Sequence, residues 1–336
     1  LQIVELVHSG CLQPGQVLVK VMVSGICGSQ LGEIDGIKGP DNYLPHMLGH
    51  EGSGYVIDVG PGVKKVKAKD KVVMHWRKSS GMDSAGPTFE WGDKIVNAGP
   101  ITTFSEYTIV SENRLTLLPS HIGFDVGSLF GCAITTGFGA VINNAELSIG
   151  NSLVVYGAGG VGLNMVQAAS LVSAYPIIAV DIHKNRLDLA SDMGATHSIN
   201  AFELGDEEII TRISNVLNGQ PLDAFIDNTG IPKIIQLGYS LVSDTGRVVL
   251  VGVPRIGQII SIFSLPMHFG KKLVGCHGGD AQPEIDIPKY ARLDESRDIG
   301  FDRLISKRYE LTNINKAIDD MRNGTIAGRC IVEMGR

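Results

Sequence analysis

The stretch Ser152-Leu-Val-Val-Tyr-Gly-Ala-Gly-Gly-Val-Gly162 decides the fold of the second half of the chain. Its apolar start is typical of a short buried strand, and residues 161–171 then follow a helical pattern. Between the two, the glycines have the spacing Gly-x-Gly-x-x-Gly. After a strand and before a helix, this spacing indicates a dinucleotide site, because backbone N–H groups and the positive helix N-terminus can bind the pyrophosphate.

Each glycine of this turn has its own physical role. Gly157 allows the tight turn, Gly159 lets the backbone approach a pyrophosphate, and Gly162 lets the helix pack closely on the strand. Gly160 and Val161 complete the turn, and we include both in the predicted cofactor site.

An acidic residue ends the next predicted strand. Asp181 lies 19 residues beyond the last glycine of the turn, where a carboxylate can accept hydrogen bonds from both ribose hydroxyls. The same carboxylate would repel a 2′-phosphate, which favours NAD over NADP. The basic residues His183, Lys184 and Arg186 follow closely and weaken this preference. We also place Arg186 in the predicted cofactor site.

The character of the chain changes between its first and second parts. Up to about residue 130 it is β-rich, with strands predicted at 17–24, 51–60 and 71–75. Residues 77–100, rich in Gly, Ser, Asp and Pro, are predicted to form a long loop. From residue 152 onward, short strands alternate with helices, which predicts a parallel sheet covered on both faces. The strands of this second part are predicted at 152–156, 177–180, 224–226, 247–251 and 273–276, and a helix at 184–193 with Gly194 as its C-cap.

Composition excludes several functional classes. A formal charge of −6 gives no reason to expect binding to nucleic acid or an anionic membrane. No apolar run approaches the roughly 20 residues that span a bilayer, and we expect no signal peptide. The five cysteines are widely spread and contain no Cys-x-x-Cys pair, which argues against disulfides and indicates a reducing compartment. We therefore expect a cytoplasmic protein.

Three side chains upstream of the glycine turn can bind a metal. They are Cys27 in Gly25-Ile-Cys-Gly-Ser29, His50 in Gly49-His-Glu-Gly52, and Cys132 in Phe130-Gly-Cys-Ala-Ile-Thr-Thr136. Two thiolates and one imidazole suit zinc and leave a fourth position for water or substrate. Each residue alone is equally compatible with an ordinary buried role, and sequence spacing does not join them into one site.

The residues around these three positions carry a family resemblance. The three segments, together with Pro61-Gly-Val63, Asp70-Lys-Val72 and Val251-Gly-Val-Pro254, resemble the zinc-dependent alcohol dehydrogenases of the medium-chain dehydrogenase/reductase family. The matches run in family order over nearly the whole chain. The resemblance implies an α/β fold with two domains: a GroES-like β-barrel catalytic domain (1–134 and 278–336) and a Rossmann NAD-binding domain with a doubly wound parallel sheet (135–277).

The resemblance also implies a reaction and its residues. It makes Cys27, His50 and Cys132 the ligands of a catalytic zinc that lowers the pKa of an alcohol while hydride passes to NAD. Glu51 would tune the metal, and Ser29 would relay the alcohol proton. Further positions implied by the resemblance are Trp76 in the substrate pocket, and Thr136, Val253 and Arg329 in the cofactor site, with Arg329 on the pyrophosphate.

Three positions depart from the family pattern. Gln30 replaces an aspartate that hydrogen-bonds the zinc-bound histidine; its amide oxygen could still orient His50, but we expect the metal to be more electrophilic or less tightly held. Gly32 replaces a histidine that passes the proton to solvent, which leaves the terminal base unassigned. His75 is a candidate for it, although a strand-end histidine is the stronger interpretation. Residues 77–100 lack the four cysteines of the family's structural zinc lobe, which predicts one zinc per subunit.

The leading interpretation is therefore an NAD- and zinc-dependent oxidoreductase of a primary or secondary alcohol or a polyol. A homodimer or homotetramer is expected from the resemblance. Two alternatives stay open: a zinc-free quinone or enoyl reductase of the same superfamily, and a non-catalytic NAD-binding relative.

Overall fold

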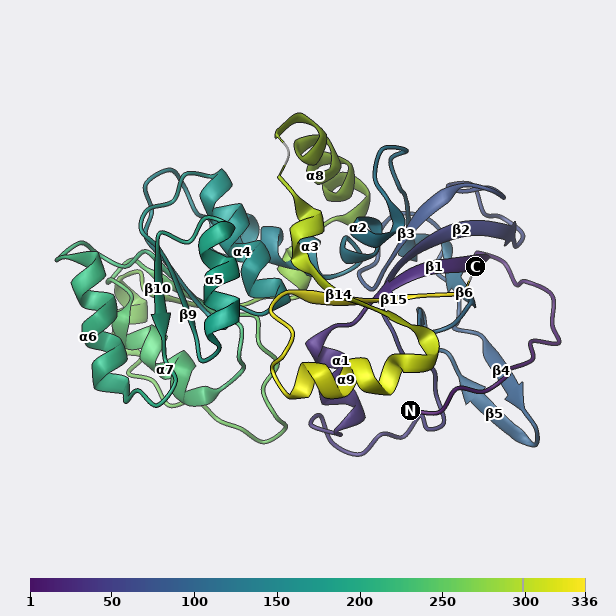
Figure 1. Cartoon of the computed structure of the whole chain (residues 1–336), viewed down its shortest axis with the longest axis horizontal. Helices are drawn as coiled ribbons and strands as arrows, with labels where there is room; N and C mark the ends of the chain where they lie inside the picture. The colour runs from purple at the N-terminus through teal and green to yellow at the C-terminus, as the bar shows by residue number, and fades with distance from the viewer. Residues whose placement is uncertain (298, 336) are drawn as a thin grey trace. The chain divides into compact units, whose positions relative to one another are not determined.

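A computed structural model describes residues 1–297 and 299–335 of the chain. It divides into two compact units (Figure 1). Unit 1 comprises Leu1–Thr135 and Gln282–Arg336, and unit 2 comprises Thr136–Ala281. The sequence predicts domain boundaries at 134/135 and 277/278. In the structure the chain passes from one unit to the other at 135/136 and 281/282.

Unit 1 is built on a seven-stranded sheet. Its strands follow the order β14-β15-β1-β2-β3-β7, with β6 pairing β1 outside this path. Most pairs are antiparallel; β14 and β15 are parallel. Alternate residues of β1 are buried, so that Val17, Val19 and Val21 enter the core. The strands are β1 Gln16–Gly25, β2 Glu51–Val59, β3 Lys71–His75, β6 Tyr107–Ser111, β7 Leu115–Leu117, β14 Ile305–Glu310 and β15 Arg329–Glu333.

The region predicted as a long loop contains a hairpin, and that prediction is wrong. Within 77–100, β4 (Thr88–Trp91) pairs antiparallel with β5 (Lys94–Asn97). Gly92 has φ +60° at the turn, and Phe89 and Val96 pack in a small cluster with Ile109. Each strand has only four residues, so the alternation is too short to stand out against the surrounding turn residues.

The helices of unit 1 other than α8 are short, and two of them start beside predicted metal ligands. Cys27 caps α1, and Cys132 directly precedes α3. The helices are α1 Gly28–Ile34, α2 Phe124–Leu129, α3 Ala133–Gly139, α8 Pro283–Arg297 and α9 Ile314–Arg322; α3 runs across the boundary into unit 2.

Unit 2 is a parallel sheet with helices α4 to α7 around it (Figure 1). The strand order is β10-β9-β8-β11-β12-β13 and all pairs are parallel, so the chain adds β9 and β10 on one side of β8 and then β11 to β13 on the other, and the strand order reverses between β8 and β11. Loops at the carboxyl ends of strands beside such a reversal form the ligand crevice of doubly wound folds. The strands are β8 Leu153–Tyr156, β9 Ile177–Asp181, β10 His197–Asn200, β11 Ala224–Asp227, β12 Arg247–Leu250 and β13 Lys272–Gly275. The helices are α4 Gly160–Leu171, α5 Lys184–Asp192, α6 Asp206–Leu217 and α7 Pro232–Leu241.

The predicted fold class is confirmed in both units. Unit 2 has the doubly wound parallel sheet, and the five predicted strands fall within a residue or two of β8, β9, β11, β12 and β13. The edge strand β10 was not predicted. None of the helices in the described ranges is long and apolar enough to span a membrane.

Candidate functional site

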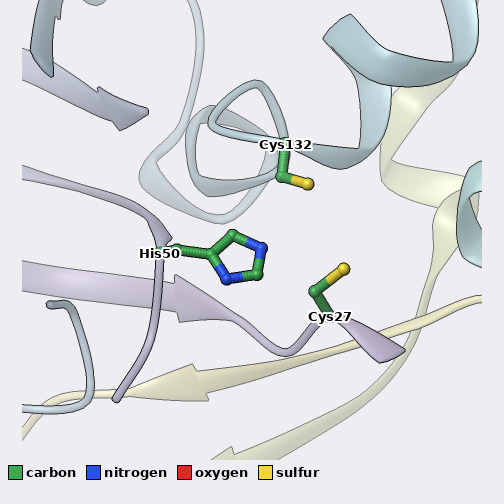
Figure 2. A group of neighbouring side chains, drawn as sticks. All are labelled: Cys27, His50 and Cys132. Atoms are coloured by element: carbon green, nitrogen blue, oxygen red, sulfur yellow. The ribbon is translucent and has the colours of Figure 1, made fainter. Parts of the chain in front are cut away.

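The three predicted metal ligands converge in unit 1. Cys27 ends the turn after β1, His50 directly precedes β2, and Cys132 directly precedes α3. Figure 2 shows the imidazole of His50 with the two sulfur atoms beside it. The ligand atoms of the three side chains all lie within 4.8 Å of one another. Residues 105 positions apart in the chain are thus brought together by the sheet and the start of α3.

This geometry fits a tetrahedral zinc ion. With Zn–S near 2.3 Å and Zn–N near 2.0 Å, the ligand atoms of one zinc lie roughly 3.4–3.8 Å apart, so only small adjustments are needed. The donor set of two sulfurs and one imidazole nitrogen is also the one that zinc prefers. Both cysteines are buried, and three ligands leave the fourth position open.

The two thiols differ in acidity. The pKa of Cys27 is well below its ordinary value, because the Cys132 thiol hydrogen-bonds to the Cys27 sulfur, with smaller contributions from Arg329 and His50. The pKa of Cys132 is raised, because its thiol donates that bond and is buried. The pair therefore favours one thiolate at Cys27, the form that binds a metal.

Glu51, which follows His50 in the chain, forms a buried ion pair with Arg329. Its Oε1 pairs with Nη2 of Arg329, and its Oε2 accepts a hydrogen bond from the Ala133 backbone N–H at 3.1 Å. Arg329 Nη1 also donates to the Ile26 carbonyl at 3.1 Å. Burial raises the pKa of Glu51, and the Arg329 guanidinium opposes that rise.

The ion pair between Glu51 and Arg329 was not predicted from the sequence. The resemblance implies a pyrophosphate role for Arg329, and that role stays a prediction; an ordinary surface arginine, the alternative, is excluded because Arg329 is buried. The ion pair joins residues 278 positions apart, and no local pattern signals it.

Gln30 lies beside His50 in the orientation opposite to the expected one. The Gln30 amide nitrogen, not its oxygen, faces Nδ1 of His50, at 3.0 Å. The oxygen accepts a hydrogen bond from the Gly49 backbone N–H at 2.6 Å, and the amide nitrogen also donates to Glu33 Oε2 at 2.9 Å. Sequence reasoning missed Glu33, which lies one helical turn beyond Gln30 on α1.

Two further predicted site residues lie near these ligands in the chain. Ser29 is half-buried at the start of α1. Trp76 directly follows β3, is partly buried and packs against the core of unit 1, with the Arg77 guanidinium 6.0 Å from its ring centre. Their roles with substrate stay predictions.

The contacts of His75, the candidate for the terminal base, give that role little support, and the space beside Gly32 is filled. A Cβ at Gly32 would lie 2.6 Å from Cδ1 of Ile37, so Ile37 fills the space beside this glycine. His75 is buried; its Nδ1 lies 2.7 Å from the Arg77 carbonyl and its Nε2 lies 2.9 Å from the Thr116 hydroxyl. Burial lowers the pKa of His75 to about 4. These contacts match the strand-end interpretation of His75.

The predicted cofactor turn in unit 2 has the backbone that its glycines imply. Gly157 has φ +98°, a conformation that favours glycine. A Cβ at Gly162 would lie 2.1 Å from the Gly157 carbonyl oxygen, so helix α4 can approach β8 only with glycine here. Gly159, the N-cap of α4, has open space where a Cβ would be. The space beside Gly159 is therefore open for a ligand to approach the backbone.

Asp181 is buried at the carboxyl end of β9. Its Oδ2 accepts a hydrogen bond from the Ala158 N–H at 2.8 Å, and its Oδ1 accepts one from the His183 N–H at 2.9 Å. Arg186 Nη1 lies 3.7 Å from Asp181 Oδ2. Asp181 and Arg186 therefore lie directly beside the glycine turn.

The loop after β11 also supports this turn, and sequence reasoning missed it. The Asn228 side chain donates to the Gly157 carbonyl at 3.0 Å. Buried Asp227 accepts hydrogen bonds from Thr229 and Gly230, which orders the loop. The run Asp-Asn-Thr-Gly after an apolar strand is a turn signal that could have indicated it.

The other two predicted cofactor residues of unit 2 lie on segments close to the glycine turn and its supporting loop: α3 packs at Gly137 against Val161, and the Val253 backbone lies beside Gly230. Thr136 is buried in α3, and Val253 is exposed after β12. Their contact with a cofactor stays a prediction.

Comparison with known proteins agrees with both units. Residues 13–120 match the alcohol dehydrogenase GroES-like domain, and residues 160–296 match the zinc-binding dehydrogenase domain. An S-(hydroxymethyl)glutathione dehydrogenase of Synechocystis sp. is 30% identical, over 96% of this chain and 94% of that protein.

Solved structures give the same result. Benzyl alcohol dehydrogenase of Acinetobacter calcoaceticus superposes with a TM-score of 0.86 and 30% identity, covering 98% of this chain and 94% of that one. An alcohol dehydrogenase zinc-binding domain protein of Burkholderia ambifaria has a TM-score of 0.86 and 29% identity, covering 96% and 93%. Unit 1 therefore has the GroES-like fold and unit 2 the Rossmann fold, and the chain belongs to the zinc-dependent alcohol dehydrogenases of the medium-chain dehydrogenase/reductase family, as an oxidoreductase.

Proposed function

We propose that Cys27, His50 and Cys132 hold one catalytic zinc, at which this chain transfers hydride between an alcohol and NAD. The observation that carries the proposal is the convergence of these three ligand atoms within 4.8 Å. Zinc bound there would act as a Lewis acid on the oxygen of an alcohol or carbonyl substrate. The remaining steps fall to the residues of the chain.

Residues of unit 1 would handle charge and the alcohol proton. Arg329 balances the buried charge of Glu51, so that this carboxylate and the Cys27 thiolate can stay ionised together. The Ser29 hydroxyl, half-buried on α1, would accept the alcohol proton. Because Gly32 has no side chain, we propose that this proton passes from Ser29 to water directly.

Residues of unit 2 would hold the cofactor. The turn of Gly157, Gly159 and Gly162 would bind the pyrophosphate at the N-terminus of α4. Asp181 would accept hydrogen bonds from the ribose hydroxyls. Its buried carboxylate beside the turn supports NAD over NADP, since a 2′-phosphate would meet a negative charge.

A single zinc per subunit is supported by the hairpin of residues 88–97. In place of a cysteine-bound lobe, this region is stabilised by a small apolar cluster that includes Phe89, Val96 and Ala98. The region 77–100 contains no cysteine. The hairpin thus has a source of stability other than a metal.

The proposed substrate is a primary or secondary alcohol or a polyol, and two compounds lead the test panel. The relatives are named for S-(hydroxymethyl)glutathione and benzyl alcohol. A polyol completes the panel, because the family resemblance includes primary alcohols, secondary alcohols and polyols.

A homo-oligomer is supported by the exposed surface of unit 2. Strand β13 is last in its sheet, and the segment before it exposes large apolar side chains. Its most exposed members are Ile256, Ile259, Phe263 and Phe269. Light scattering with size-exclusion chromatography tests the dimer or tetramer. We also propose a cytoplasmic location, which is supported by five free cysteines.

Zinc content tests the proposed function. Elemental analysis of the parent chain should give about one zinc per subunit, and Cys27→Ala should give almost none. Cys11→Ala, at an exposed cysteine, is the matched control and should keep the zinc. Two zinc ions would contradict the single site. A folded parent chain with none, purified without chelator, would favour a zinc-free reductase or a non-catalytic relative, which assays of NADH or NADPH oxidation with quinone and enoyl substrates then separate.

A further inference from the structure

The buried amide of Gln30 is held by two partners that cannot change roles. Its Oε1 accepts a hydrogen bond from the Gly49 backbone N–H at 2.6 Å, and its Nε2 donates to Glu33 Oε2 at 2.9 Å. A backbone N–H can only donate, and an ionised carboxylate can only accept. These partners therefore determine which end of the amide faces His50, and it is the NH₂ end, 3.0 Å from Nδ1.

This orientation selects one form of the His50 ring. Facing a donor, Nδ1 must accept a hydrogen bond, so the ring proton lies on Nε2. Nε2 is on the ring edge nearest the two sulfur atoms (Figure 2), and His50 hydrogen-bonds to the Cys27 sulfur. Both nitrogens of His50 are thus satisfied without a metal.

A metal at this site needs the other form of the ring. To bind through Nε2, His50 must carry its proton on Nδ1, and that N–H normally donates to a carboxylate, a carbonyl or water. Gln30, as Gly49 and Glu33 hold it, presents a donor there instead. Two donors would then face each other in a buried position, which is costly.

We propose that Glu33 and Gln30 together weaken zinc binding by holding His50 in the form that cannot coordinate. Zinc binding requires the Gln30 side-chain amide to flip, so that its oxygen faces His50, and this flip breaks its hydrogen bonds to Gly49 and Glu33. The ring proton moves from Nε2 to Nδ1 through solvent, so the His50 ring neither gains nor loses a proton. The inference rests on the proposed zinc site and concerns how tightly that site holds the metal.

Glu33→Gln separates this mechanism from simple electrostatics. A carboxamide at position 33 can donate or accept, so the Gln30 amide can turn over at lower cost. We expect the dissociation constant for zinc to fall about threefold to tenfold, a modest effect because Glu33 is exposed. Electrostatics alone predicts weaker binding, since the variant removes a negative charge near a cation. Glu203→Gln, an exposed site in unit 2, makes the same charge change and should have no effect.

Gln30→Glu is the second variant. Its carboxylate can accept from the Gly49 N–H and from the Nδ1–H of His50 together, so we expect zinc to bind about 10–100-fold more tightly. Competition with a chromogenic zinc chelator measures both variants and the parent chain. Unchanged or weaker binding in either variant would overturn the proposal.

The ring form itself is visible without zinc or activity. In metal-free protein with ¹⁵N-labelled histidine, the His50 nitrogen shifts should show a protonated Nε2 and a bare Nδ1, and zinc should reverse them. The His50 signals are assigned by their loss in His50→Gln. A proton on Nδ1 in the metal-free chain would overturn the inference. A parent chain that binds no zinc would refute the proposed metal site itself. Adverse results from the two variants or from the nitrogen shifts would refute only this inference, because the parent chain would still bind one zinc per subunit.

Discussion

Glu51 and Arg329 form an ion pair that is closed to solvent on both sides, with the two side chains 0% and 4% exposed. The pair lies next to the metal ligands. Glu51 directly follows His50 in the chain, and the Arg329 guanidinium hydrogen-bonds to the Cys27 sulfur and contributes to the low pKa of Cys27. Two buried charges cost much to desolvate, and their attraction offsets this only while both are present. The pair therefore links the stability of unit 1 to the charge at the metal site.

Removing one partner should cost more than removing both. Arg329→Met leaves Glu51 buried and unpaired, and we expect about 3–5 kcal/mol less stability. In Arg329→Met/Glu51→Gln both charges of the ion pair are removed, and most of the loss should be recovered. Urea unfolding of the metal-free proteins measures this. A double variant as unstable as the sum of the single ones would show that the ion pairing is not the cause.

Two neighbouring glycines of the cofactor turn should respond differently to the same substitution. At Gly159 a Cβ meets open space in the cofactor-free chain, so Gly159→Ala should keep its melting temperature and lose NAD affinity at least tenfold, because the methyl group takes the space of the pyrophosphate. At Gly162 a Cβ meets the Gly157 carbonyl oxygen at 2.1 Å, so Gly162→Ala should lose both stability and NAD affinity. Calorimetry of NAD binding and thermal unfolding test the pair. Unchanged NAD binding in Gly159→Ala would place the pyrophosphate elsewhere.

The features predicted well from sequence have local causes. The turn of Gly157 to Gly162 lies between an apolar strand and a helix, and each glycine has a conformational or packing reason within a few residues. The inner strands β8, β9 and β11 are mostly apolar runs, because both faces of a parallel sheet are buried there; the polar edge strand β10 has no such signal. The three ligands were joined only through family resemblance, since nothing in their spacing brings them together.

The features that sequence did not reveal depend on distant partners. The orientation of the Gln30 amide is determined by Gly49, which lies 19 positions away and becomes its neighbour only in the fold. Arg329 pairs with a carboxylate 278 positions away. The hairpin β4–β5 is held by packing of Phe89 and Val96 on Ile109, and its own four-residue strands are too short for a clear pattern.

Cofactor preference should depend on Asp181 with Arg186 beside it. In Asp181→Ser the negative charge at the ribose site is removed, while Arg186, 3.7 Å from that carboxylate, stays available for a 2′-phosphate. We expect the ratio of kcat/KM for NAD to that for NADP to fall at least tenfold. The Ala158 N–H loses its acceptor in this variant, so unfolding must be measured alongside. The double variant Asp181→Ser/Arg186→Ala tests the part played by Arg186. If kcat/KM for NADP rises in Asp181→Ser but not in the double variant, the rise depends on Arg186.

His75 should make the chain less stable in acid. Burial lowers its pKa to about 4 in the folded chain, against about 6.5 when unfolded. Between these values the unfolded chain holds one more proton, so stability rises with pH through this window and falls as pH drops from 6.5 toward 4. The loss attributable to His75 is about 3 kcal/mol. His75→Gln removes the titrating group, so metal-free His75→Gln should lose that much less stability than the parent chain between pH 7 and pH 4. Parallel profiles for the two proteins, measured by urea unfolding with a chelator present, would mean that His75 takes up its proton without leaving its contacts with Arg77 and Thr116.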